Sequence, residues 1–249
     1  MKRKKLGVGT LFRDSLVWCG HQVGQVTRFF NQIDSQTGFN NSNRLIYALE
    51  GDSEDDTLES LMQKERGRSD FTLLKHDSGG FMRSNADSGR MARLSKLGDK
   101  VLGVLEGKTE YVLWVESDLI MVSDTMVQNL VGVLDDNSFV GAIAPLVTYE
   151  THLNRFYDVW GFRNLNGVSW KQNGGEMARA RKSQWTSVAS VGSCCLFRGT
   201  LLEDGVRFKQ GAFVDFCSQI KARNYEIWVD SKEEVRHPSK MGMINGRWI

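Results

Sequence analysis

Two carboxylates that stand one residue apart, Glu116 and Asp118, are the residues in this sequence that point most directly to chemistry. They follow the apolar run 111–115, which has no polar face and therefore predicts a central strand of an open α/β sheet. Ligands in such sheets bind just beyond the carboxyl ends of the strands. Two adjacent carboxylates repel each other unless a cation or an arginine lies between them, so the pair indicates a site for a divalent cation and a phosphate. The alternative is an acidic strand end, and the spacing alone leaves both interpretations open.

The first half of the chain alternates predicted strands with predicted helices. The strands are expected at 5–12, 44–49, 71–75 and 111–115, and the helices at 21–33, 58–65 and 90–105. Gly7 and Gly9 in the first strand would let a neighbouring element approach closely. This order predicts a mainly parallel sheet with right-handed crossovers. With 249 residues and no visible linker, the chain is expected to form one domain.

The second half has a different texture. Its predicted elements are a helix at 127–134, strands at 140–145, 188–197 and 227–229, and a helix at 213–223. A long stretch from 148 to 185, rich in Trp, Gly, Asn and Arg, separates them. Loops of that length inside a compact domain are usually functional or mobile. His237 is expected just beyond the last strand.

The composition is that of a globular protein, with 41% hydrophobic and 25% charged residues. A net charge of +2 is too small to argue for nucleic-acid binding. No apolar stretch reaches the roughly 20 residues of a membrane span, and the basic start is not followed by the apolar segment of a signal peptide. The four cysteines lack zinc-like spacing, which favours a reducing, cytoplasmic setting.

The order of these pieces resembles the GT-A glycosyltransferases. Residues 90–102 (RMARLSKLGDKVL) and 156–167 (FYDVWGFRNLNG) are similar to segments of the capsule α-mannosyltransferases of cryptococcal fungi. Residues 112–120 (VLWVESDLI) and 187–197 (SVASVGSCCLF) look more like the fungal Golgi α-mannosyltransferases. The resemblance implies a Rossmann-like α/β fold, with a mainly parallel central sheet flanked by helices. It also implies a nucleotide-sugar-binding half at 1–118 and an acceptor-binding, metal-completing half at 119–249.

The resemblance further implies a divalent cation, Mn²⁺ or Mg²⁺, that neutralises the charge developing on a departing nucleoside diphosphate. Asp118 is the expected metal ligand, and His237 corresponds to the histidine that completes the metal site in many such enzymes. Glu116 is expected to act as a second, water-mediated ligand or to contact the ribose or the sugar. Ser117, between the two carboxylates, is grouped with the donor-binding residues.

Other donor contacts are expected where the early strands end. Thr10, Leu11, Arg13 and Glu50 correspond to positions that surround the base and the ribose in GT-A enzymes. Their alternative role is ordinary turn chemistry. Arg90 and Asp99 fall on the family helix that reaches toward the phosphates and the donor sugar. Where the family shows Arg-Asn this chain has Gly98-Asp99, so Arg93 or Lys96 is the candidate replacement for the missing arginine.

The acceptor side is expected in the second half. Asp215, at the start of a helix, is the candidate general base of an inverting transferase, or an acceptor-orienting residue in a retaining one. Its alternative role is that of a carboxylate favoured by the helix dipole. In the long basic stretch, Trp160, Arg163 and Trp185 are the candidate acceptor contacts. The stretch is alternatively a solvated loop whose tryptophans are anchored in the core.

The leading hypothesis is a metal-dependent glycosyltransferase that moves a hexose from a UDP- or GDP-type sugar to an acceptor hydroxyl, by default on a glycan. Because the chain shows no membrane anchor, a bacterial or phage enzyme is expected, and hydroxymethylated DNA bases are an alternative acceptor. A nucleotidyltransferase would share the acidic site but usually carries a Gly-rich phosphate loop, which Gly7 and Gly9 do not form. A non-catalytic nucleotide-sugar-binding module is the alternative from another class.

Overall fold

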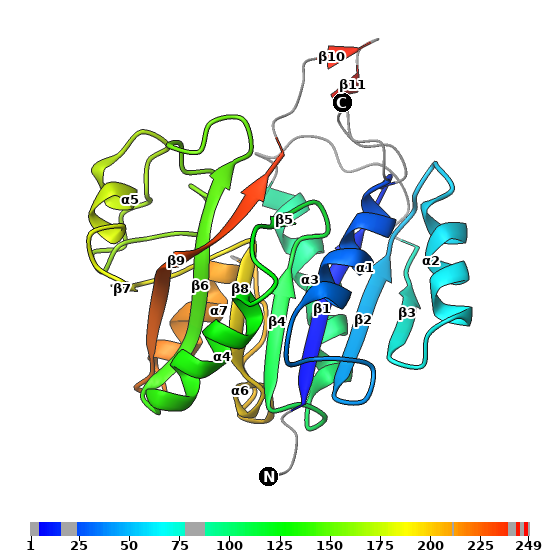
Figure 1. Ribbon diagram of the computed structural model, residues 1–249, viewed down its shortest axis with the longest axis horizontal. Helices are drawn as coiled ribbons and strands as arrows, with labels where there is room; N and C mark the ends of the chain where they lie inside the picture. Colours follow the sequence, from blue (N-terminus) through cyan, green and yellow to red (C-terminus); the bar gives the residue numbers. More distant parts are fainter. Residues whose placement is uncertain are drawn as a thin grey trace.

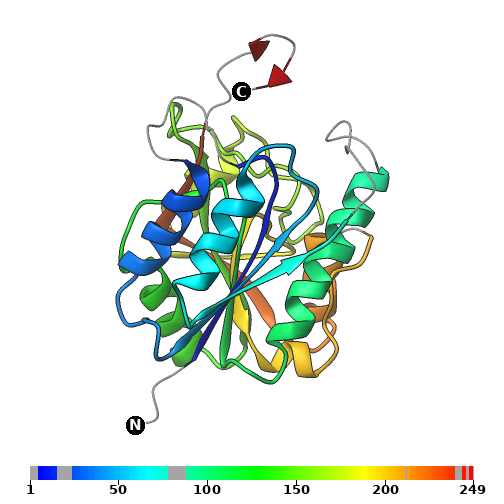
Figure 2. The ribbon, with the colours of Figure 1, turned by 90° about the vertical axis from the view of Figure 1, so that its right-hand side faces the viewer.

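A twisted sheet runs through the computed structural model, with helices on both faces (Figures 1 and 2). The structure describes residues 5–15, 24–77, 88–210 and 212–238, and the backbone of 243–244 and 247–248. Within these residues nine strands form one sheet, in the order β3-β2-β1-β4-β8-β6-β9-β5, with β7 paired to β9. Helices α1 and α4 cover one face, and α3 and α7 cover the other (Figure 2).

The first half has the predicted parallel arrangement, since β1 pairs in parallel with both β2 and β4, and β2 pairs in parallel with β3. The strands are β1 (Leu6–Phe12), β2 (Arg44–Glu50), β3 (Phe71–Lys75) and β4 (Tyr111–Val115). The helices are α1 (Gln25–Ser35), α2 (Thr57–Arg66) and α3 (Ser88–Leu105). The predicted start of the first helix, at 21–23, lies outside the described residues.

Two glycines of β1 allow α3 to pack directly on the strand, as the sequence predicts. A Cβ atom on Gly7 would lie 2.7 Å from Leu105, and one on Gly9 would lie 3.1 Å from Val101. A side chain at either position would require Leu105 or Val101 of α3 to move. The position of α3 is thereby set, and with it the position of its first turns near the carboxyl end of β4.

The second half is mixed rather than parallel. β8 pairs antiparallel with both β4 and β6, whereas β6 and β9 are parallel. The remaining two strands of the sheet, β5 and β7, pair antiparallel with β9. The strands are β5 (Ile120–Met121), β6 (Val140–Tyr149), β7 (Trp185–Val188), β8 (Cys194–Arg198), β9 (Glu226–His237), β10 (Met243–Ile244) and β11 (Arg247–Trp248). The helices are α4 (Met126–Asp136), α5 (Gly175–Ala180), α6 (Thr200–Glu203) and α7 (Phe213–Lys221).

Three strand predictions in this half were wrong in extent. The predicted strand 140–145 continues to Tyr149 in β6. The predicted strand 188–197 is divided, because β7 ends at Val188 and β8 begins only at Cys194. The predicted strand 227–229 is part of the 12-residue β9, so His237 is the last residue of a strand and does not lie beyond it. In the second part of β9 exposed and buried residues alternate, which hides a strand from a search for apolar runs.

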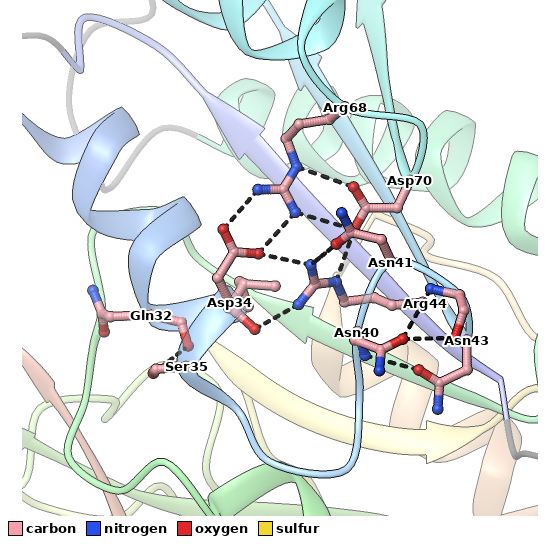
Figure 3. Close-up of polar contacts among 11 residues, drawn as sticks. Gln32, Asp34, Ser35, Asn40, Asn41, Asn43, Arg44, Arg68 and Asp70 are labelled. Carbon is pink, nitrogen blue, oxygen red and sulfur yellow. Dashed lines mark hydrogen bonds and ion pairs between the residues drawn. The ribbon is translucent and has the colours of Figure 1, made fainter.

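A buried cluster of arginines and aspartates lies at the edge of the sheet where the parallel strands begin (Figure 3). Arg44, the first residue of β2, is 2% exposed and bonds Asp70 through Nε (3.0 Å) and Nη2 (2.8 Å). Arg44 also donates to Asp34 (2.7 Å) and to the carbonyl of Ile33 (2.7 Å). Arg68 bonds both aspartates from the other side, at 2.7–3.0 Å. The cluster therefore joins the end of α1 to the starts of β2 and β3.

The cluster makes stability dependent on pH. Burial opposes the ionisation of Asp34, but Arg68 and Arg44 outweigh it and hold the pKa of Asp34 below its usual 3.8. Because the folded pKa is below the unfolded one, the stabilisation is present above the unfolded pKa and is lost as pH falls through the folded pKa. We expect the stability difference between wild type and Asp34→Asn, measured by urea unfolding, to shrink from about pH 5 to about pH 3. A difference that stays constant over this range would contradict the assignment.

No helix among the described residues is both long enough and apolar enough to cross a bilayer.

Candidate active site

Glu116, Ser117 and Asp118, here called the acidic triplet, follow directly after β4. They lie at the edge of the sheet to which the parallel strands point, the upper edge in Figure 1. The backbone N–H of Glu116 donates to the carbonyl of Ser193 at 2.9 Å, and the N–H of Leu119 donates to the carbonyl of Glu116 at 3.2 Å. The chain therefore turns directly after the strand. Both carboxylates are held in that turn, at the carboxyl edge where ligands of α/β sheets bind.

His237 meets Asp118 at this edge, so the structure brings the two predicted metal ligands together. Nε2 of His237 lies 3.1 Å from Oδ2 of Asp118, and Nδ1 lies 2.7 Å from the carbonyl oxygen of Pro238. A carbonyl oxygen can only accept, so Nδ1 carries a hydrogen and Nε2 faces the carboxylate. Two lone pairs at that distance repel, so the pair requires either a proton or a cation between its members.

The pair fits a divalent cation. Oδ1 of Asp118 is buried and has no hydrogen-bond partner in the described part of the chain. That part contains no group of three or more His, Cys, Asp or Glu side chains arranged around a metal position. Mg²⁺, which prefers oxygen ligands, is typically bound by one or two carboxylates, with phosphate oxygens and water filling the other positions. Asp118 and His237 thus offer one carboxylate and one imidazole to such an ion.

The charges around the triplet are unequal. Burial, followed by the negative charges of Asp118 and Asp158, raises the pKa of Glu116 above its usual value. Ser193 and Arg90 act in the opposite direction. Burial would also raise the pKa of Asp118, but the hydrogen bond and the charge of His237 hold that pKa below its usual value. Asp118 is therefore the carboxylate that the surroundings keep ionised, and Glu116 is the one that they resist ionising.

Helix α1 supports the triplet from one side. Arg28 donates from Nη2 to the carbonyl of Asp118 at 3.1 Å, and Gln25 donates from Nε2 to Oγ of Ser117 at 2.9 Å. Ser117 is 7% exposed. Its hydroxyl thus anchors the turn to α1, a structural contact that the predicted donor role did not include. Gln25 and Arg28 are three residues apart on one face of α1, and the sequence analysis singled out neither of them.

The residues predicted to surround a nucleoside lie at the ends of β1 and β2. Thr10 is fully buried, and Leu11 is partly buried. Arg13 lies 3.5 Å from Asp14. Glu50 is 4% exposed and accepts the N–H of Ser53 at 2.8 Å. An open groove of about 360 Å³ adjoins this strand end, and it is lined by Glu50, Asp52, Ser53, Leu58, Lys75, His76 and Asp77.

The three predicted donor residues of helix α3, which are Arg90, Arg93 and Asp99, lie in different surroundings. Arg90 is close enough to Glu116 for its charge to lower the pKa of that carboxyl, whereas Arg93 is exposed. Asp99 lies nine residues after Arg90, about 13 Å further along the helix axis. It accepts the N–H of Phe208 at 3.1 Å. Asp99 therefore ties α3 to the segment before α7, and Arg90 is the member of the three whose charge acts on Glu116.

Asp215 lies in the first turn of α7, as predicted. Phe213 at the start of this helix packs edge-on against Trp114, the strand residue two before Glu116, with ring centroids 6.3 Å apart. Cys217, two residues after Asp215, hydrogen-bonds to the backbone of Val191. The first turn of α7 is thus fixed between the end of β4 and the segment that leads into β8.

The three candidate acceptor residues have different surroundings. Trp160 is 70% exposed and lies in the turn that follows Asp158. Arg163 donates to Oγ of Ser169 at 2.8 Å and so closes a small hairpin. Trp185 pairs with Asp230 in the sheet, seven residues from His237 along β9, a separation of roughly 20 Å. Trp160 is therefore the most exposed member of the set, and it follows Asp158 by two residues in the chain.

Two residues that the sequence did not single out complete the site. The ring of Tyr157 stacks on the ring of His237, with centroids 3.7 Å apart and planes inclined by 11°. Asp158, 6% exposed, accepts the N–H groups of Gly161 (3.1 Å) and Ser193 (2.6 Å). Both residues lie in the segment 156–167 on which the mannosyltransferase resemblance rests, so the sequence carried a signal for the segment but not for these contacts.

The fold is that of the GT-A glycosyltransferases, a mostly parallel mixed sheet flanked by helices with an acidic pair at the carboxyl edge. The chain aligns with S. aureus TarS 1–349 in complex with UDP-GlcNAc at a TM-score of 0.63 and 15% identity, over 96% of this chain and 60% of that one. It aligns with the mannosyltransferase PcManGT from Pyrobaculum calidifontis, in complex with GDP-Man and Mn²⁺, at a TM-score of 0.62 and 14% identity, over 94% of this chain and 56% of that one.

The present chain thus spans 56–60% of the length of these two structures. No family model matches its sequence, and no curated protein matches it either. At 14–15% identity, the solved structures show a common fold. The GT-A part of the sequence resemblance is thereby confirmed, and the comparisons do not extend it to the fungal mannosyltransferases.

Proposed function

We propose that this protein is a metal-dependent glycosyltransferase that moves a hexose from a UDP- or GDP-type sugar to a hydroxyl of a glycan. The observation that carries the proposal is the Asp118–His237 pair, in which a buried carboxylate oxygen without a hydrogen-bond partner lies beside an imidazole at the end of a central strand. Support comes from two structures of the same fold, one in complex with UDP-GlcNAc and one with GDP-Man and Mn²⁺.

Asp118 and His237 are the residues that would hold Mn²⁺ or Mg²⁺. When bound, the ion neutralises the charge that develops on the leaving diphosphate. Arg28 fixes the backbone of Asp118, and Arg90 adds a positive charge beside Glu116. The groove lined by Glu50 and His76 offers carboxylate and imidazole groups to the base and the ribose. Donor binding is thus divided between the ends of β2 and β4.

On the acceptor side, we assign the role of general base to Asp215. Its carboxylate takes the proton of the acceptor hydroxyl while the hydroxyl oxygen bonds to the anomeric carbon, and the bond from that carbon to the diphosphate oxygen breaks. Trp160 offers an exposed aromatic face on which a sugar ring can stack. Such a ring can receive a sugar or a nucleobase, and we take a glycan hydroxyl as the default acceptor.

A thermal-shift screen of UDP-, GDP- and dTDP-sugars with and without Mn²⁺ tests the proposal. A donor at about 100 times its dissociation constant stabilises the folded state by about 2.7 kcal/mol, which raises the melting temperature of a chain of this size by about 5–10 °C. We expect that shift for a UDP- or GDP-sugar and only with Mn²⁺ present. No shift with any donor would rule out the proposed function. A shift without release of nucleotide in the presence of sugar acceptors would favour a non-catalytic binding module.

A further inference from the structure

We propose that Tyr157 and Asp158, in the segment 156–167 that also carries Trp160, are positioning residues for the donor site: Tyr157 fixes the ring of His237, and Asp158 fixes the position of Glu116 through Ser193. The inference rests on the proposed function of the site. Tyr157 contacts His237, whereas Asp158 connects to Glu116. Trp160, the exposed acceptor candidate, lies two residues after Asp158 in the chain.

The first contact concerns the orientation of the imidazole. The hydrogen bond from Nδ1 of His237 to the carbonyl of Pro238 fixes one edge of the ring but leaves its tilt free. The stack with Tyr157 fixes the plane, because the two rings are nearly parallel at 3.7 Å. Tyr157 is itself held by its N–H bond to the carbonyl of Val147 (2.9 Å) and by the edge of Tyr149 at 5.3 Å. Nε2 is thereby directed at Asp118.

The second contact passes through Ser193. Asp158 accepts the N–H of Ser193 at 2.6 Å, and the carbonyl of Ser193 accepts the N–H of Glu116 at 2.9 Å. Ser193 thus bridges the carboxyl of Asp158 and the backbone of Glu116. A displacement of Asp158 would move the Ser193 backbone that holds Glu116 in place.

The surrounding backbone is shaped to receive Asp158. A Cβ atom on Gly192 would lie 2.2 Å from Oδ2 of Asp158, and one on Gly161 would lie 2.5 Å from Cα of Gly192. Distances this short exclude any side chain at either glycine. The backbone at Gly161 thus contacts the backbone at Gly192, just before β8. The carboxyl of Asp158 is enclosed where these two segments meet.

Direct Mn²⁺ binding to the full chain, followed by electron paramagnetic resonance, separates positioning from folding. Supporting partners of a metal-ligating histidine typically change metal affinity by about 10–100-fold. We expect Tyr157→Leu to weaken Mn²⁺ binding by about that factor, and Tyr157→Phe, which keeps the stacked ring, to restore most of the affinity. Tyr47→Leu is the matched control, because Tyr47 is a partly buried tyrosine that lies on β2 and contacts Lys108. It should bind Mn²⁺ like the wild type.

Asp158→Asn provides a second, isosteric variant should Tyr157→Leu not fold. Its amide cannot accept both N–H groups that the carboxylate accepts, so we expect kcat for nucleotide release to fall by about 10-fold or more while Mn²⁺ affinity and the KM for the donor change little. Wild-type Mn²⁺ affinity in Tyr157→Leu, or an unchanged kcat in Asp158→Asn, would overturn this inference alone. A wild-type protein that binds neither Mn²⁺ nor any nucleotide would overturn the proposed function and this inference with it.

Discussion

Replacing Asp118 with asparagine is expected to lower the rate of donor turnover by about 10³-fold and to leave the protein folded. Asparagine keeps the shape of the side chain but removes the charge that would hold the cation. A bound cation contributes several kcal/mol to the stabilisation of the departing diphosphate, and about 4 kcal/mol corresponds to about 10³-fold in rate. Nucleotide release from UDP- and GDP-sugars in Mn²⁺ measures the effect.

The fold should tolerate this change, because Asp118→Asn also removes one of the charges that raise the pKa of Glu116. Asp136→Asn is the matched control: Asp136 is an exposed carboxylate at the last position of α4, and its replacement should leave turnover unchanged. Asp118→Asn should also lose the Mn²⁺-dependent part of the thermal shift. If Asp118→Asn kept more than about a tenth of the wild-type rate, Asp118 could not be the metal ligand.

The features that could be predicted from the sequence are those that local pattern determines. The run 111–115 has no polar face, so it had to be a fully buried strand, and its end had to place Glu116 and Asp118 at the carboxyl edge. The alternation of strands and helices in the first half determines parallel pairing, because a parallel neighbour needs a crossover connection. Gly7 and Gly9 likewise indicated the close approach that α3 makes.

The features that could not be predicted depend on pairing between distant segments. β9 carries exposed charged residues such as Lys232 in alternation with buried ones, and it becomes a strand only because β6 and β5 lie beside it. Asp158 meets Ser193 across 35 residues, and no local spacing encodes that contact. The division of 188–197 likewise follows from distant pairing, because β7 pairs with β9 whereas β8 lies between β4 and β6.

The ion cluster at the amino edge of the sheet is a further contact between distant segments, and it leads to the largest expected effect on stability. Arg44 has almost no access to solvent, and its guanidinium reaches two aspartates and the carbonyl of Ile33. Asp70 is 3% exposed and cannot turn to water if Arg44 is lost. Arg68 remains beside both aspartates and compensates in part.

Arg44→Met is therefore expected to lower the free energy of unfolding by about 3 kcal/mol, the lower end of the range for breaking a buried ion pair. Methionine fills most of the space of the arginine stem, so the loss reports the unpaired carboxylate and carbonyl and not a cavity. Urea unfolding at neutral pH measures the loss. Arg66→Met, at an exposed position on the last turn of α2, is the control and should cost less than about 0.5 kcal/mol. A loss below about 1 kcal/mol for Arg44→Met would mean that Arg68 alone neutralises the cluster.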